Sequence, residues 1–237
     1  VPTPSLFCRA YFFCVFDLPP TPRPIYREIA IPVPQPAGVT NLPANIFFQL
    51  RRSFTAAQEQ RIKDAINGVL FHWFTHHNEK WNGGANNGVS QLAACANTYA
   101  TKNLAPIWYQ GPPIPNGLGA TNLAMDQFTQ LIRDNGFRLS SPARIDPQIS
   151  TTIRAATAIT QIRTPLLFQI NPKQLDNPSV SNVLLVGSMF HAWLHRAGFY
   201  HPKETSYFIA ESPMCLMRGF QPKNPIVPDS FYIQFFD

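Results

Sequence analysis

The sequence lacks any run of about 18 apolar residues, which is the length that a membrane-spanning helix needs. Its most apolar stretch in the C-terminal half, Val183 to Phe190, is short and contains Gly187 and Ser188. Charged residues are few, at 14% of the chain, and the 19 Lys and Arg residues behind the net charge of +6 are scattered. No basic module with interleaved aromatic residues stands out. We therefore expect a protein that binds neither membranes nor nucleic acid.

Cysteine is also scarce, and no CxxC pair is present, which argues against a zinc site built from cysteines. Four cysteines allow three different pairings if all of them are bridged, and the spacing does not choose among these pairings. No internal repeat or low-complexity tract is visible. The cysteines are Cys8, Cys14, Cys95 and Cys215.

Proline, by contrast, is abundant, with 24 residues in a chain of 237. Many of these prolines fall within residues 1–44, where they oppose helix formation. The stretch from Leu6 to Leu18 is too apolar for a flexible linker and should lie against the rest of the protein. We predict an extended N-terminal arm or pro-segment over residues 1–44 and a single domain over residues 45–237.

Periodicity and capping signals predict a mixture of strands and helices in residues 45–237. Thr55 and Gln58 form a capping-box pattern at the start of one helix, and Asn135-Gly136 form a stop signal at the end of another. The predicted strands cover Asn45–Leu50 and Pro165–Ile170, and the predicted helices cover Thr55 to about His76, Val89–Tyr99, Leu123–Arg133, and Val180–Ala197 with Asn177, Pro178 and Ser179 at its start.

The last of these helices carries the pattern H-x-x-x-H-x-x-G-x-x-H, formed by His191, His195, Gly198 and His201. Residues four apart lie on one face of a helix, so the first two imidazoles can converge on one metal ion. Glycine can adopt the left-handed conformation that ends a helix and turns the chain back. The spacing therefore predicts a metal site with three histidine ligands, and the simpler alternative is three histidines that only pack or hydrogen-bond there.

This pattern resembles the signature of the metzincin clan of zinc peptidases, H-E-x-x-H-x-x-G-x-x-H followed by a methionine turn. Met214 stands where that turn is expected, either as the hydrophobic floor of the metal site or as an ordinary core residue. The resemblance implies an α/β (α+β) fold, with a twisted mixed sheet, an active-site helix and an irregular C-terminal subdomain. It also implies a secreted zinc-dependent endopeptidase that acts on peptides or proteins.

The sequence departs from that signature at Ala192, where the clan has the glutamate that acts as general base. Zinc binding should survive this change, whereas hydrolysis should fall by about 10²–10⁴-fold or more. Either an engineered Glu-to-Ala replacement or a natural pseudoprotease that binds peptides or proteins would explain the alanine. The complete set of three histidines favours the engineered replacement.

Other groups of residues allow secondary hypotheses. Members of the clan are often kept latent by an N-terminal segment, and Cys8 or Cys14 could supply a latency ligand to zinc if they do not form a disulfide. His72 and His76 offer a second pair at helical spacing, without a glycine or third histidine to complete a site. Glu204 or Glu211 could orient a ligand histidine, although surface or capping roles are alternatives for both.

Overall fold

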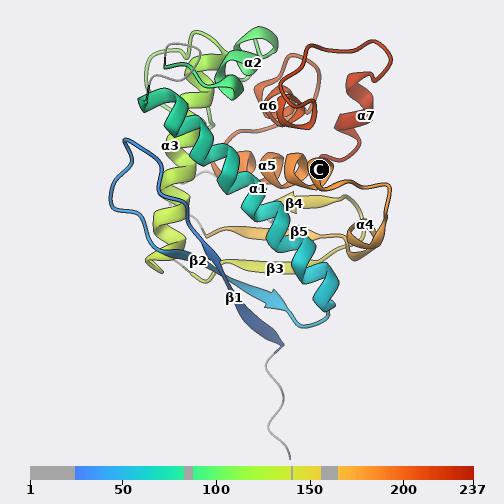
Figure 1. The fold of residues 1–237 in the computed structure, drawn as a ribbon. Coiled ribbons are helices and arrows are strands. Elements are labelled where there is room, and N and C mark those ends of the chain that lie inside the picture. The colour runs from blue at the N-terminus through green and yellow to red at the C-terminus, as the bar shows by residue number, and fades with distance from the viewer. Residues whose placement is uncertain (1–24, 83–87, 140, 156–164) are drawn as a thin grey trace, which may run out of the picture.

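The computed structural model describes residues 25–82, 88–139, 141–155 and 165–237. Within these ranges, five strands form one mixed sheet in the order β1-β2-β3-β5-β4 (Figure 1). The β1/β2 and β4/β5 pairs are antiparallel, and the two pairs between them are parallel. The strands are β1 (Tyr26–Pro32), β2 (Asn45–Arg51), β3 (Arg144–Pro147), β4 (Ile153–Ala155) and β5 (Leu167–Ile170). β4 therefore lies at one edge of the sheet.

The helices pack on the sheet and on one another, which makes this a mixed α/β fold. Figure 1 shows α1 crossing the sheet, and α6 and α7 lying on the opposite side of α5 from the strands. The helices are α1 (Ala56–Trp81), α2 (Gln91–Tyr99), α3 (Gly117–Gly136), α4 (Pro172–Asp176), α5 (Asn182–Arg196), α6 (Phe208–Met217) and α7 (Asp229–Ile233). None of the helices in the described ranges has the length and apolarity needed to cross a bilayer.

Helix α1 begins where its capping signal predicts. The Thr55 side chain accepts the Gln58 backbone N–H at 3.2 Å, and the Gln58 side chain accepts the Thr55 N–H at 3.0 Å. The helix continues past the predicted end near His76 as far as Trp81. His76 and His77 are both buried, so the last turns remain part of the packed interior.

Helix α5 is buried on nearly all sides, as a helix in the middle of a domain should be. Trp193 stacks on Phe168 of β5, with ring centroids 6.3 Å apart and an interplanar angle of 17°. The edge of the Phe128 ring from α3 meets the same tryptophan at 5.2 Å. These contacts fix the rotation of α5 about its axis, and with it the direction of the histidines at 191 and 195.

The predicted start of this helix, Val180, was too early by two residues. Ser181 is the N-cap, because its side chain accepts the Leu184 backbone N–H. Asn177 to Ser179 instead belong to the connection after α4. Helix α3 differs in the opposite direction: it begins at Gly117, capped by the Asn116 side chain, well before the predicted Leu123.

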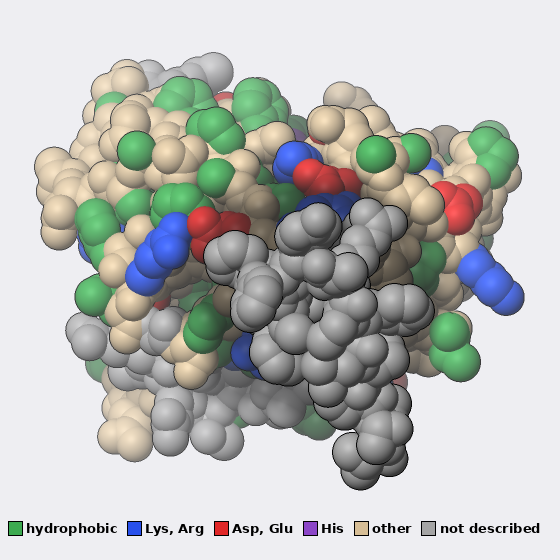
Figure 2. All heavy atoms as spheres, turned by 90° about the horizontal axis from the view of Figure 1, so that it is seen from below, with side chains coloured by type: hydrophobic (Ala, Val, Ile, Leu, Met, Phe, Trp, Pro, Cys, Tyr) green, Lys and Arg blue, Asp and Glu red, His purple; other side chains and the backbone are tan. Residues whose placement is uncertain are grey.

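Strand β1 lies inside the segment predicted as an arm and pairs with β2 along its whole length, from Tyr26 opposite Arg51 to Pro32 opposite Asn45. At least this part of residues 1–44 belongs to the sheet. The apolar stretch Leu6–Leu18 lies outside the described residues. On the face drawn in Figure 2, Lys and Arg side chains of the described residues lie beside Asp and Glu rather than in one continuous basic area.

Candidate metal centre

The first two histidines of the motif lie one turn apart on α5. Their ring centroids are 4.7 Å apart and the two rings are perpendicular. His191 is fully buried and His195 is 5% exposed. Because the backbone of α5 is fixed by the packing of Trp193 on the sheet, the relative placement of the two rings does not depend on flexible loops.

Gly198 turns the chain directly after α5. Its φ is +96°, and a Cβ added there would lie 2.3 Å from the Trp108 indole nitrogen, so no other residue fits without displacing Trp108. The same indole N–H donates to the Ala197 carbonyl at 2.9 Å. The bend returns the chain so that the His201 ring lies 4.8 Å from the His195 ring and 6.1 Å from that of His191. The prediction that three imidazoles meet at one place is confirmed.

The hydrogen bonds of the two helical histidines define their tautomers. His191 Nδ1 lies 2.9 Å from the Ile209 carbonyl oxygen, and His195 Nδ1 lies 3.0 Å from that of Phe199. A carbonyl can only accept, so each Nδ1 carries the proton and donates it. Each Nε2 then presents a lone pair, and both Nε2 atoms are buried without a hydrogen bond to any described residue. This is the arrangement found in histidines that bind metals.

A carboxylate that the motif does not include completes the group. Asp237 Oδ1 lies 3.1 Å from His191 Nε2 and 3.4 Å from His195 Nε2. One ligand atom from each of His191, His195, His201 and Asp237 can be chosen so that all four lie within 4.8 Å of one another. Three imidazoles and one carboxylate are suitable donors for a transition metal, so the residues fit a metal ion.

Burial favours the neutral form of His191 and His201. It lowers the pKa of His191 to about 4, although the neighbouring Asp237 acts in the opposite direction. Burial also lowers the pKa of His201, and His195 adds to this effect. Neutral imidazole is the form that binds metal, because protonation removes the lone pair.

A cavity of about 280 Å³ opens beside the centre. The metal-centre residues His195, His201 and Asp237 form part of its wall, together with Tyr200. The rest comes from edge strand β4 and the segment before it, residues 150–155. The metal centre is therefore accessible from a space that runs along the edge of the sheet.

The other residues singled out in the sequence have different surroundings. Ala192 follows His191 and is fully buried. Met214 is also fully buried, but it lies within helix α6 rather than in a turn. Cys8 and Cys14 lie outside the described residues, whereas Cys95 and Cys215 form a disulfide between α2 and α6.

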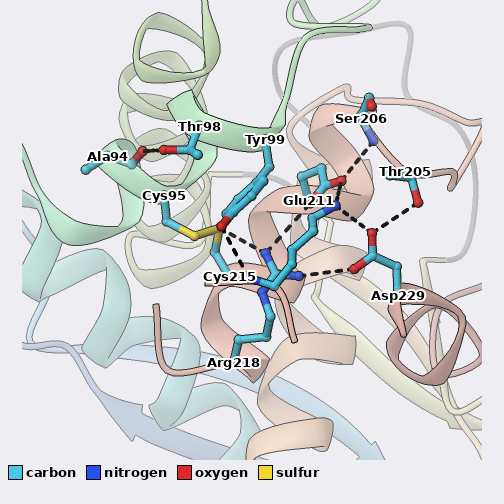
Figure 3. Close-up of polar contacts among 11 residues, drawn as sticks. Ala94, Cys95, Thr98, Tyr99, Thr205, Ser206, Glu211, Cys215, Arg218 and Asp229 are labelled. Carbon is cyan, nitrogen blue, oxygen red and sulfur yellow. Dashed lines mark hydrogen bonds and ion pairs between the residues drawn. A yellow bond between two sulfur atoms is a disulfide. The ribbon is translucent and has the colours of Figure 1, made fainter. Parts of the chain in front are cut away.

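Glu211 does not orient a ligand histidine. It is fully buried, and its Oε1 accepts the Lys223 ammonium at 2.7 Å and the Ser206 backbone N–H at 2.9 Å (Figure 3). The atoms that orient His191 and His195 are backbone carbonyls, for which a sequence carries no residue-type signal. Sequence reasoning also missed Asp237, because no fixed spacing connects a distant carboxylate to a helical motif.

The pair His72 and His76 is not part of a metal-binding group. The only cluster of three or more potential ligands in the described part of the chain is the one around His191. His76 Nδ1 instead lies 2.7 Å from the Ser90 hydroxyl, and Trp73 between the two histidines is fully buried. This segment of α1 serves packing.

Comparisons with protein families, with characterised proteins and with solved structures found no significant match to this chain.

Proposed function

We propose that this chain is a zinc-binding domain of metallopeptidase type, similar to the metzincins in its motif, that holds zinc without hydrolysing peptides. The observation that carries the proposal is the pair of buried Nε2 lone pairs, with both Nδ1 atoms anchored on backbone carbonyls. Such pre-oriented imidazoles are costly to bury without a partner. A divalent cation between them removes that cost.

Zinc is the metal that best suits these donors, since imidazole and carboxylate ligands at four positions match its tetrahedral preference. When bound, zinc supplies Lewis-acid chemistry at this place. The surrounding residues do not supply the proton transfer that peptide hydrolysis also needs. Ala192 is fully buried and has no group that accepts a proton.

A peptide is the ligand class that the neighbouring surface favours. Among the described strands, β4 pairs only with β5, so one edge of β4 has no partner strand. A peptide can pair with the backbone N–H and C=O groups of such an edge as a further strand. The cavity beside the metal centre is lined by β4. Both the peptidase and the pseudoprotease hypotheses include peptide binding. Ala192 favours the pseudoprotease hypothesis for this chain.

The disulfide between Cys95 and Cys215 supports an oxidising, extracellular location, since such bonds are rare in reducing compartments. A latency role for the N-terminal segment rests on Cys8 and Cys14, which the described ranges do not include. It stays a prediction from the sequence.

Metal content tests the proposal directly. Native mass spectrometry and elemental analysis of the full chain, purified without chelator and reconstituted with zinc, should give one zinc per chain. The His195→Ala variant should lose it, whereas His72→Ala, which removes a histidine outside the centre, should retain it. A wild-type protein that binds no zinc or other divalent transition metal at micromolar concentration would overturn the proposal.

A further inference from the structure

We propose that Asp237 is a direct fourth ligand of the metal, so that four side chains close the coordination sphere and leave no position for water or substrate. This inference rests on the proposed zinc binding and adds which group occupies the fourth coordination position. A three-histidine site alone would keep that position open, which is the usual arrangement in catalytic zinc sites. Sites with four protein ligands are characteristic of structural zinc.

The distances place the Asp237 oxygen at a corner of the coordination tetrahedron. With metal–ligand bonds of about 2.0–2.1 Å, two ligand atoms of a tetrahedral zinc site are about 3.3 Å apart. Asp237 Oδ1 lies 3.1 Å from His191 Nε2 and 3.4 Å from His195 Nε2. A carboxylate that acted on the metal through a water would lie farther away, because a hydrogen bond of about 2.6–3.2 Å to that water would intervene.

The chemistry of the facing atoms leads to the same assignment. Both Nδ1 atoms donate to carbonyls, so both Nε2 atoms face the carboxylate with lone pairs. Neither Nε2 atom nor Asp237 Oδ1 makes a hydrogen bond within the described part of the protein, and all three atoms are buried. Three acceptors that face one another repel, and a cation bound between them removes that repulsion.

Three contacts hold the residues before Asp237 against the metal centre. The Phe236 ring stacks on the His191 imidazole with centroids 4.5 Å apart and planes at 4°, and it is 1% exposed. The Ser188 hydroxyl of α5 donates to the Phe235 carbonyl at 2.9 Å. The Lys203 ammonium donates to the Phe236 carbonyl at 2.6 Å. Asp237 thus reaches the metal site from a segment fixed on α5 and on the loop that follows His201.

A second, partly buried group of charges anchors the helix that leads into this segment. Asp229 at the start of α7 accepts the Lys223 ammonium at 2.5 Å and lies 3.5 Å from the Arg218 guanidinium (Figure 3). The same two cations contact Glu211 of α6, and the ring of Tyr99 covers both of them. Two carboxylates and two cations leave this group without net charge. It ties α7 to α6 and limits how far Asp237 can move from the metal.

The experiment uses the full chain loaded with cobalt(II), whose visible absorption reports coordination number, and azide as an exogenous ligand. Azide should leave the wild-type spectrum unchanged, because no position is open to it. In Asp237→Ala it should shift the spectrum in a saturable way. Asp126→Ala, which removes an exposed carboxylate of α3, is the matched control and should behave as the wild type.

Asp237→Asn, which keeps the size of the side chain, provides a second measurement if the alanine variant does not fold. Its zinc affinity, measured by competition with a chelating dye, should fall by about 10-fold or more. Saturable azide binding to the wild type would overturn the closed site while leaving zinc binding intact, and so would unchanged affinity in Asp237→Asn. Failure of the wild type to bind any metal would instead overturn the proposed function, and with it this inference.

Discussion

Individual side chains determine the chemistry of this site. His191 and His195 differ from His76 in the group that their Nδ1 atoms contact. In His191 and His195 the partner is a backbone carbonyl, which leaves Nε2 as the available lone pair. In His76 it is the Ser90 hydroxyl, which can donate or accept and therefore defines no tautomer. A backbone carbonyl at Nδ1 thus sets the candidate ligands His191 and His195 apart from the packed His76.

Position 192 gives the first prediction. Ala192→Glu supplies the missing carboxylate, but it should give no detectable peptide hydrolysis while Asp237 occupies the fourth position. The double variant Ala192→Glu with Asp237→Ala should hydrolyse a fluorogenic peptide library, and a chelator should abolish that activity. Activity in the single variant would show that the site opens without removal of Asp237, contrary to the closed coordination proposed above.

The buried histidines of α1 predict acid destabilisation. Burial lowers the pKa of His76 to about 3, with smaller contributions from His77 and Lys80, whereas an unfolded chain protonates histidine near pH 6.5. The folded pKa is thus the lower one, so this histidine costs no stability above about pH 6.5. Below that value the unfolded state binds the proton first, and the free energy of unfolding should fall by about 1.4 kcal/mol per pH unit until about pH 3.

Urea unfolding of metal-free protein at a series of pH values measures this slope. His76→Gln, which cannot be protonated in this range, should show a slope smaller than that of the wild type by about the contribution of one histidine. The two proteins differ in no titratable group other than His76, so all other contributions cancel in the comparison. Equal slopes between pH 6.5 and 4 would mean that His76 is already able to accept a proton in the folded state.

At the scale of helices and strands, local sequence signals predicted the presence of an element better than its first and last residues. The capping box at Thr55 placed the start of α1 correctly, because it depends on two side chains three residues apart. The end of α1 was predicted too early, because its last turns are stabilised by burial that local signals do not show. The start of α3 was predicted too late, because the cap at Asn116 was not recognised, and the start of α5 was wrong by two residues. Strand β1 was not predicted, because its partner β2 stabilises it and the prolines around it obscure the pattern.

The disulfide gives a prediction at this scale. Cys95 and Cys215 join α2 to α6 across a sequence separation of 120 residues. Closing so long a loop restricts the unfolded chain, and removing such a bond typically costs about 2–4 kcal/mol. The double variant Cys95→Ser with Cys215→Ser should lose this amount in urea unfolding under non-reducing conditions. Adding a reductant should destabilise the wild type and leave the double variant unchanged, and an equal effect on both would argue against this pairing.

For the molecule as a whole, the sequence revealed the three-histidine motif but not the way the chain closes around it. The motif was readable because helix geometry and one glycine determine its spacing. The carboxylate of Asp237 comes from beyond α7, and contacts between distant segments, such as the packing of Phe236 on His191, bring it there. Sheet order likewise depends on contacts between segments far apart in the chain, which local patterns do not encode.

The metal centre joins α5, the loop after Gly198 and the segment after α7, so metal binding should stabilise the entire domain. A ligand that binds only the folded state at 100 times its Kd adds about 2.7 kcal/mol, which for a chain of this size raises Tm by about 5–10 °C. Calorimetry with zinc and with chelator should give this difference in the wild type. His191→Ala lacks a buried ligand and should show the same Tm in both conditions, whatever its own stability. In Asp237→Ala the zinc-dependent increase in Tm should be smaller but still present. Three imidazoles still bind the ion, whereas the segment after α7 is no longer attached to it.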